Sequence, residues 1–228
     1  MSTVLLLRHG RTTANAEGGL AGNSPVGLDE VGRAQAVAVG ERLRPLPLAA
    51  VVSSPLPRCR ETLALALPEA EVTVDDRLVE CGYGDWQGRP LKELAKDPLW
   101  PVVQLHPAAA RFPGEGGESL AAMAARAVAA IREWDAKLGP DALWLACSHG
   151  DVIKAIVADA LGLHLDLFQR IVIDPGSVTA IRYTPTRPFL LRLGDTGELR
   201  FPPPESQPGQ DAAVGGGAGG GSFGKVEE

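Results

Sequence analysis

Two histidine-glycine pairs, each placed directly after an apolar run, are the residues whose types and spacing suggest chemistry. Arg8-His9-Gly10 follows the apolar run 4–7, and His149-Gly150 comes just after the apolar run 142–147. Short apolar runs bounded by turn residues are typical of buried strands. Open α/β sheets bind their ligands where loops leave the carboxyl ends of the strands. The two pairs can therefore meet in one crevice, where an arginine and two imidazoles would favour an anion, although a single histidine in a loop is often only structural.

A further source of positive charge is the segment 53–62, where an apolar strand expected at 49–52 runs into a helix. We expect Ser54 to cap this helix, Pro55 to occupy its first turn and Arg58 to lie near its amino end. Helix amino termini and guanidinium groups both bind phosphate. Arg58 and Arg60 point to different sides of a helix, so only one of them can face the crevice. The alternative is that both are solvated arginines on the helix surface, which is usual for such residues.

Two loops supply the remaining candidates. Glu80 lies in a glycine-punctuated loop, 78–88, that also carries Tyr83 and Trp86. Glu80 is a candidate proton donor, and the alternative is that it caps the turn or pairs with an arginine. Asn15 lies in the Gly-, Asn- and Ala-rich segment 13–26, where it could bind an anion or only brace a turn.

Two histidines, at least two arginines and one acid predict phosphoryl transfer. An imidazole can attack phosphorus, and the arginines with the second imidazole, if protonated, can neutralise the charge that spreads over the phosphoryl oxygens. The acid can protonate the leaving alkoxide and later activate water. The sequence shows neither an acidic cluster of the Mg²⁺ type nor a P-loop. We therefore expect no metal site and no cofactor.

The elements that must position these residues alternate between strands and helices. This alternation predicts an α/β fold with one domain, a mainly parallel twisted sheet and helices on both faces. We expect this domain over residues 1–200 and a disordered Pro/Gly-rich tail over 201–228. The expected strands are 4–7, 49–52, 71–74, 142–147, 171–173, 177–183 and 188–193, the last pair antiparallel, and the longer helices begin near Asp29 and Ser119. The proline-punctuated segment 90–113, with one short helix at 91–95, is expected to form a lid, and His106 and His164 are expected at the surface.

Composition limits the partners. The chain has 228 residues with a net charge of -6, which argues against nucleic acid or an anionic membrane as the main partner. Its three cysteines form no C-x-x-C pair and are odd in number, so neither a disulfide framework nor a zinc site is indicated. The sequence shows no export signal and no membrane-spanning run. We expect a cytoplasmic protein acting on a phosphorylated small molecule, and a homodimer is compatible with the sequence.

The ordered set of motifs resembles the histidine phosphatase superfamily, also called phosphoglycerate mutase-like. The resemblance spans roughly residues 1–195 and rests on five stretches: 7–12 with Asn15, 53–62, 80–88, 116–119 and 148–150. It implies that His9 is the phosphorylated nucleophile and Glu80 the proton donor. It also implies that Arg8, Arg58 and His149 form the phosphate pocket, with Asn15, Thr12 and Gly150 as further phosphate or substrate contacts.

Two positions depart from the family pattern. Arg11 stands where the family often has an acid or an amide, and it could add charge to the pocket or face solvent. Cys59 replaces a small residue and is expected to be packed.

The segment between Glu80 and Gly116 is short compared with the helical insertion that cofactor-dependent mutases of this family have at this place. The resemblance therefore favours a phosphatase acting on a phosphate monoester over a cofactor-dependent phosphomutase. The mutase remains the alternative, and a non-catalytic phosphate-binding protein is a third option. We expect the segment 90–113 and the aromatic loop to set specificity. Trp86, Tyr83 and Phe112 could stack on a leaving group or enclose it, and the alternative is that Trp86 and Tyr83 form a small satellite core.

Overall fold

The apolar run near the amino terminus becomes β1 (Ser2–Arg8), a strand in the interior of the sheet. Successive side chains of a strand point to opposite faces. Val4 and Leu6 accordingly enter one hydrophobic cluster, and Leu5 and Leu7 enter a second cluster on the other face. Both faces of β1 are therefore buried, which explains why its sequence is continuously apolar rather than alternating.

The computed structural model describes residues 2–197, so the tail predicted over 201–228 lies outside the described residues. Within the described range, six strands form one sheet in the order β3-β2-β4-β1-β5-β6. β2 (Leu48–Ser53), β3 (Val72–Val74) and β4 (Leu143–Ser148) pair in parallel, and β4 is also parallel to β1. β5 (Val178–Tyr183) is antiparallel to β1, and β6 (Pro188–Asp195) is antiparallel to β5. The predicted mainly parallel sheet with a final antiparallel pair is confirmed.

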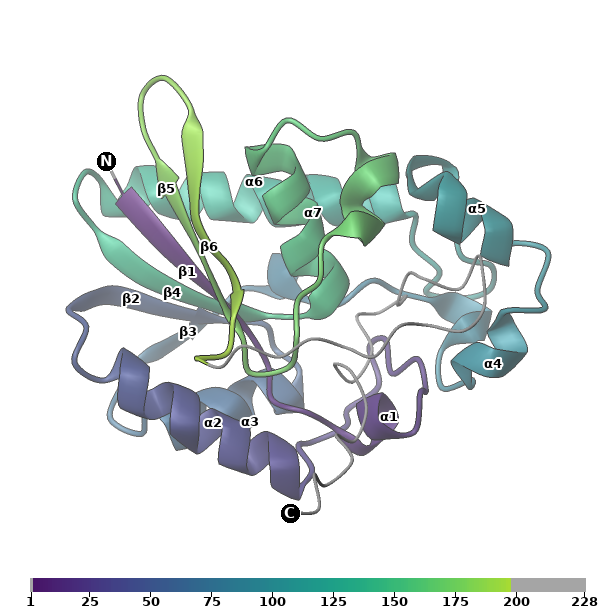
Figure 1. Cartoon of the computed structure of the whole chain (residues 1–228), viewed down its shortest axis with the longest axis horizontal. Coiled ribbons are helices and arrows are strands. Elements are labelled where there is room, and N and C mark those ends of the chain that lie inside the picture. The colour runs from purple at the N-terminus through teal and green to yellow at the C-terminus, as the bar shows by residue number, and fades with distance from the viewer. Residues whose placement is uncertain (1, 198–228) are drawn as a thin grey trace, which may run out of the picture.

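Helices cover both faces of this sheet (Figure 1). α2 (Glu30–Leu43) and α3 (Pro57–Ala66) lie on one side, and α6 (Leu120–Leu138) and α7 (Gly150–Ala160) lie on the other. Asp29 caps α2 by accepting a hydrogen bond from the Gly32 amide, and Ser119 caps α6 in the same way through the Ala122 amide. Both predicted helix starts are confirmed.

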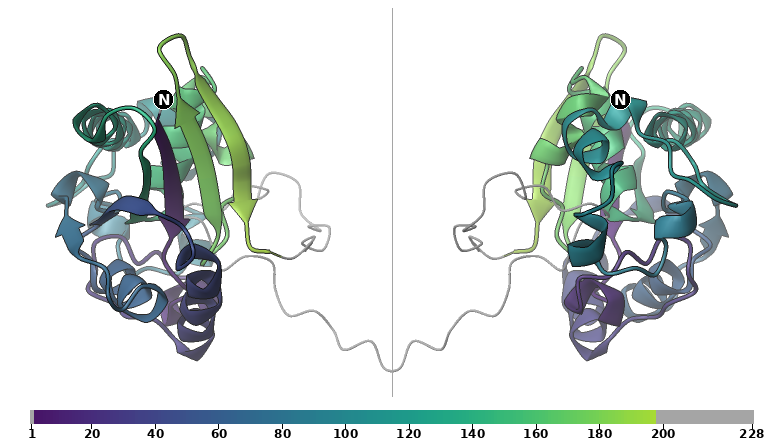
Figure 2. Two further views of the ribbon diagram at one scale, coloured as in Figure 1. Left: turned by 90° about the vertical axis from the view of Figure 1, so that its left-hand side faces the viewer. Right: turned by 90° about the vertical axis from the view of Figure 1, so that its right-hand side faces the viewer.

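Shorter elements gather beyond the carboxyl ends of the parallel strands. α1 (Thr13–Ala16), α4 (Leu91–Leu94) and α5 (Trp100–Leu105) lie at this end, which faces the viewer in the right-hand view of Figure 2. The segment 90–113 holds two short helices and a 3-10 turn at Pro107–Ala109, where one helix was expected. Leu94, Trp100 and Val103 anchor it in the core. The remaining 3-10 turns are Asp76–Leu78, Gly84–Trp86 and Leu165–Arg170.

The strand expected at 171–173 is wrong. Ile171 and Ile173 are buried, Val172 is exposed, and the segment joins no ladder. The carbonyl oxygen of Ile173 instead accepts a hydrogen bond from the Arg8 side chain. His106 and His164 are exposed, as predicted. Among residues 2–197, no helix is long and apolar enough to cross a membrane.

Candidate active site

The pairing of β1 with β4 brings the two histidine-glycine turns together. Arg8 lies opposite Ser148 in the register, and the His9 amide donates to the Ser148 carbonyl over 3.1 Å. The imidazole rings of His9 and His149, which are 140 positions apart in the sequence, are consequently 5.2 Å apart between centroids. Both side chains are buried. The sheet therefore brings His9 and His149 together at the ends of two neighbouring strands, as the sequence predicted.

Hydrogen bonds select one tautomer of His9. Its Nδ1 lies 2.7 Å from the Gly10 carbonyl oxygen, which can only accept, so Nδ1 carries the proton. Nε2 is then the nitrogen with the lone pair, and Arg58 Nε donates to it over 3.2 Å. Burial, with the positive charges of Arg58 and Arg8, holds the pKa of His9 well below its usual range. The ring is therefore neutral near pH 7, and its lone pair faces a guanidinium.

Of the two arginines on α3, Arg58 is the one whose side chain enters the site. Its Nη1 and Nη2 donate to the carbonyl oxygens of Ser24 and Gly22 at 3.1 and 2.7 Å. Arg60, two residues further along α3, is exposed. The alternative that helix geometry left open is thus decided in favour of Arg58.

The guanidinium of Arg8 is buried, and some of its N–H donors have no hydrogen-bond partner among the described residues. Its Nη1 donates to Ile173 O over 2.7 Å, whereas Nε and Nη2 have no partner among the described residues. Burial lowers its pKa to about 10, and the carboxylates of Glu80, Asp174 and Asp151 oppose that shift. Arg8 therefore stays charged at neutral pH. Unsatisfied buried donors are costly, and phosphoryl oxygens are acceptors that match a guanidinium fork.

His149 is held by residues that the sequence argument had assigned elsewhere. Its Nε2 lies 2.7 Å from Ser54 Oγ and 3.6 Å from Cys59 Sγ. The prediction that Ser54 caps the helix, with Pro55 in its first turn, is wrong: α3 begins at Pro57, which takes the first-turn proline position, and Leu56 precedes it without a side-chain cap. Burial and the nearby Arg58 lower the pKa of His149 well below its usual range. A phosphoryl dianion beside the ring would raise that pKa again.

Glu80 is a buried acid close to these cations. Its Oε1 accepts a hydrogen bond from the Cys81 amide at 2.9 Å. Burial raises the pKa of Glu80 to about 7, and the negative charge of Asp151 adds to the rise. An acid with this pKa can both give and take a proton near neutral pH. Asp151 itself accepts from the Tyr83 hydroxyl at 2.8 Å and pairs with Lys154 at 3.4 Å. Sequence reasoning missed this buried group, although Asp151 directly follows the His149-Gly150 motif.

Thr12 and Asn15 lie in the wall of one pocket with His9, Arg58 and Glu80, and they are hydrogen-bonded to each other. Thr12 is the N-cap of α1 and accepts from the Asn15 amide, and Asn15 Oδ1 accepts in return from Thr12 N and Oγ1 at 3.1 and 3.0 Å. Gly150 is the first residue of α7, directly after His149 at the N-cap, and that N-cap has no side-chain hydrogen bond. The amino end of a helix suits an anion.

A narrow pocket of about 20 Å³ opens among these residues, with room for about one water molecule. Its wall includes His9, Arg58, Glu80 and Tyr83, and the loop 18–22 closes it on one side. Arg8 and His149 do not line this opening. Among the described residues, no group of three or more His, Cys, Asp or Glu side chains could hold a metal ion.

Arg11, Trp86 and Phe112, which the sequence analysis considered for the site, do not line the pocket. Arg11 forms a 2.7 Å ion pair with Asp29, the N-cap of α2, so it ties the loop after β1 to that helix. Trp86 and Phe112 are buried in the core, where their rings pack against each other at 5.3 Å. The expectation that all three aromatic side chains flank a leaving group is not met, because only Tyr83 lines the pocket.

Comparisons with known proteins agree with this geometry. The chain is 36% identical over 174 residues to glucosyl-3-phosphoglycerate phosphatase of Mycolicibacterium vanbaalenii, covering 72% of this chain and 76% of that one. It is 31% identical to 2,3-bisphosphoglycerate-dependent phosphoglycerate mutase 2 of Gloeobacter violaceus, covering 76% and 82%. The structure of a mycobacterial glucosyl-3-phosphoglycerate phosphatase in complex with VO3 superposes with a TM-score of 0.73 at 29% identity, covering 82% and 96%.

The sequence model of the histidine phosphatase superfamily (branch 1) matches residues 4–196, which covers the sheet and its helices except for the first residues of β1. The motifs that carried the resemblance lie in that range and in the order of the family. Members of three of these motifs, Thr12, Arg58 and Tyr83, line the pocket together with His9 and Glu80. This chain belongs to the histidine phosphatase superfamily, branch 1.

Proposed function

We propose that this protein hydrolyses a phosphate monoester without a metal ion, through a phosphohistidine formed on His9. The observation that carries the proposal is the state of His9. Its Nδ1 proton is committed to the Gly10 carbonyl, and Nε2 keeps its lone pair beside Arg58. A neutral imidazole with a fixed lone pair next to cationic donors suits nucleophilic attack on a phosphoryl group.

In the first step, His9 Nε2 attacks phosphorus and the bond from phosphorus to the ester oxygen breaks. The hydrogen bond from Arg58 Nε to His9 Nε2 breaks, which frees the lone pair for the attack. Arg58 also exchanges its contacts with Gly22 and Ser24 for phosphoryl oxygens, which opens a pocket that is otherwise too small for a phosphate ester. Arg8 offers its two unpartnered donors, and His149 gains a proton as the dianion raises its pKa. Protonated Glu80 gives its proton to the leaving alkoxide.

In the second step, water attacks the phosphorus of the phosphohistidine. Glu80, now ionised, takes the proton from this water, and the bond between phosphorus and Nε2 breaks. Inorganic phosphate leaves, and His9 regains its lone pair while Glu80 regains its proton. A pKa of about 7 lets Glu80 serve in both directions near neutral pH.

The substrate class that we propose is a phosphorylated small molecule. A relative at 36% identity is named as a glucosyl-3-phosphoglycerate phosphatase, so that compound belongs in a substrate panel with 3-phosphoglycerate, sugar phosphates and phosphoserine. All three cysteines are buried and unpaired, which supports the proposal of a cytoplasmic enzyme. Sedimentation velocity of the purified chain tests the homodimer.

The decisive experiment is to trap the intermediate. Protein mixed with a labelled phosphate ester is quenched in alkali, where phosphohistidine survives, and the labelled peptide is identified by mass spectrometry. We expect label on His9, and neither label nor activity in His9→Ala. His106→Ala, at an exposed histidine, is the matched control and should keep both. Full activity in His9→Ala would refute the mechanism.

A phosphomutase is the second candidate, since one relative is named as a 2,3-bisphosphoglycerate-dependent mutase. The two activities differ in the acceptor of the phosphoryl group, which is water in a phosphatase and a second hydroxyl in a mutase. An assay on 3-phosphoglycerate, with and without 2,3-bisphosphoglycerate, separates them. Release of inorganic phosphate that the bisphosphate does not stimulate supports the phosphatase. Formation of 2-phosphoglycerate that depends on the bisphosphate supports the mutase.

A further inference from the structure

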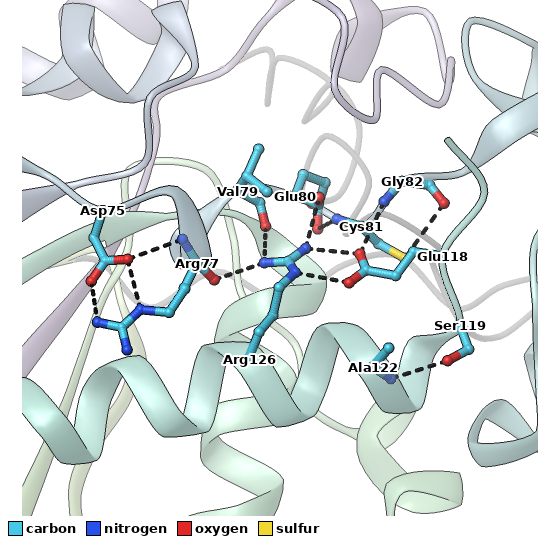
Figure 3. Close-up of polar contacts among 10 residues, drawn as sticks. All are labelled: Asp75, Arg77, Val79, Glu80, Cys81, Gly82, Glu118, Ser119, Ala122 and Arg126. Carbon is cyan, nitrogen blue, oxygen red and sulfur yellow. Dashed lines mark hydrogen bonds and ion pairs between the residues drawn. The ribbon is translucent and has the colours of Figure 1, made fainter. Parts of the chain in front are cut away.

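Arg126 lies on α6, outside the motifs that carried the family resemblance, yet its guanidinium reaches the backbone that carries Glu80 (Figure 3). Its Nη1 donates to the carbonyl oxygens of Arg77 and Val79, both at 2.7 Å. Its Nη2 donates to the carbonyl of Glu80 itself at 3.1 Å. Three carbonyl groups in the chain leading to the acid are therefore held by one side chain.

A carboxylate completes this arrangement. Glu118 accepts from Arg126 Nε at 2.8 Å and from Nη2 at 2.9 Å, so all five N–H donors of the guanidinium are used. Glu118 Oε2 also accepts from the Gly82 amide at 3.3 Å, and its own amide donates to the Gly82 carbonyl at 2.8 Å. Arg126 and Glu118 thus clamp the backbone on both sides of Glu80.

The peptide unit between Glu80 and Cys81 connects this clamp to the carboxyl group. A trans peptide is planar, and its C=O and N–H point in opposite directions. The C=O of this unit accepts from Arg126, and its N–H donates to Glu80 Oε1 at 2.9 Å. Turning the carbonyl away from Arg126 would turn the N–H away from the carboxyl group.

We propose that Arg126, braced by Glu118, is a positioning residue that orients the carboxyl group of Glu80 for proton transfer to the leaving group. The inference rests on the proposed role of Glu80 as proton donor. Arg126 does not line the pocket, and its hydrogen bonds reach Glu80 through the planar peptide unit. Its side chain is 20% exposed, so a purely stabilising surface pair is the competing explanation.

The leaving group separates the two explanations. A nitrophenolate departs without a proton, whereas an alkoxide needs one, so a defect in the proton donor affects alkyl phosphates far more than aryl phosphates. We compare kcat/KM for 4-nitrophenyl phosphate and glycerol phosphate, because this ratio reports transfer of the phosphoryl group to the enzyme. The proteins are wild type, Glu80→Gln, Arg126→Met and the double variant. Arg132→Met, an exposed arginine on the same helix, is the control.

We expect Arg126→Met to lower kcat/KM about tenfold or more on the alkyl phosphate and less than about threefold on the aryl phosphate. The reason is that a 1 Å misplacement of a catalytic group such as the Glu80 carboxyl can cost about 100-fold in rate. The double variant should be no worse than Glu80→Gln, because Arg126 acts through that residue. The Cys81 hydrogen bond favours ionised Glu80, so its loss should also move the alkaline fall in activity to higher pH. Arg132→Met should resemble wild type.

Equal losses on both substrates, or losses that add in the double variant, would overturn the inference and leave a structural role. If Glu80→Gln itself shows no preference for the aryl phosphate, the proposed function of Glu80 fails instead. Circular dichroism checks each fold. Where Arg126→Met does not fold, Arg126→Lys serves as the second variant: it keeps the stem and the charge but lacks the fork. It should show a smaller defect of the same kind, and equal losses on the two substrates would again overturn the inference.

Discussion

Replacing Glu80 by glutamine should stabilise the folded protein at alkaline pH. Glu80 is 4% exposed, and burial with the nearby Asp151 raises the pKa of its carboxyl group from 4.5 to about 7. A folded-state pKa above the unfolded value means that folding favours the protonated acid. Its stabilising contribution is fully present below pH 4.5 and is lost as pH rises through about 7. Glutamine resembles the protonated acid in shape and never ionises.

The size of the effect follows from the two pKa values. A shift from 4.5 to about 7 corresponds to about 3 kcal/mol of free energy of unfolding, at 1.36 kcal/mol for each pH unit. Part of this stabilising free energy is already lost at pH 5, because the ordinary pKa of the carboxyl group is 4.5. Between pH 5 and pH 8, wild type should therefore lose about 2 to 3 kcal/mol relative to Glu80→Gln.

The assay is urea unfolding of both proteins at several pH values from 5 to 8. The quantity to compare is the difference in free energy of unfolding between the two proteins at each pH, because other titrating groups cancel in it. Glu93→Gln, at an exposed glutamate, is the control, and its difference from wild type should stay nearly constant across the range. Removing a surface carboxylate changes stability by only about 0.5 kcal/mol.

A difference between wild type and Glu80→Gln that does not change from pH 5 to pH 8 would refute the reasoning. It would mean that Glu80 ionises in the folded protein as it does in the unfolded chain. Glu80 would then be fully ionised at pH 7 and could not act as a proton donor there. This stability measurement tests the electrostatics of the site independently of any substrate.

Two further predictions concern neighbours of the site. Asp151→Asn removes a negative charge that raises the pKa of Glu80, so the alkaline fall of kcat/KM on an alkyl phosphate should move to lower pH; an unchanged profile, measured beside Asp159→Asn on the same helix, would contradict this. Gly32→Ala should destabilise the protein by about 1 to 3 kcal/mol in urea unfolding and reduce kcat/KM, because a Cβ on α2 would overlap the Arg11 carbonyl oxygen. Wild-type stability in Gly32→Ala would show that the contact between α2 and the loop after β1 can relax.

Local features of the sequence were sufficient to predict the layers of the fold. Continuous apolar runs predict strands buried on both faces, and the strand β1 bears this out because its alternate side chains enter two clusters. Capping residues likewise predict where α2 and α6 begin, since a cap hydrogen bond joins residues three positions apart. The same reasoning failed for Ser54. Its hydroxyl has a partner 95 residues away, His149, and a local rule cannot include such a partner.

The sequence by itself determined that two histidines, two arginines and an acid are available near strand ends, and the order of the motifs determined the family. Only the tertiary structure decided which tautomer His9 adopts and that Glu80 titrates near neutral pH. Arg126 belongs to this second group, because it is 46 residues from the Glu80 carbonyl that it holds. The physical reason is that secondary structure depends on neighbours within a few positions. A pKa or a side-chain orientation depends on burial and on charges that distant segments bring together.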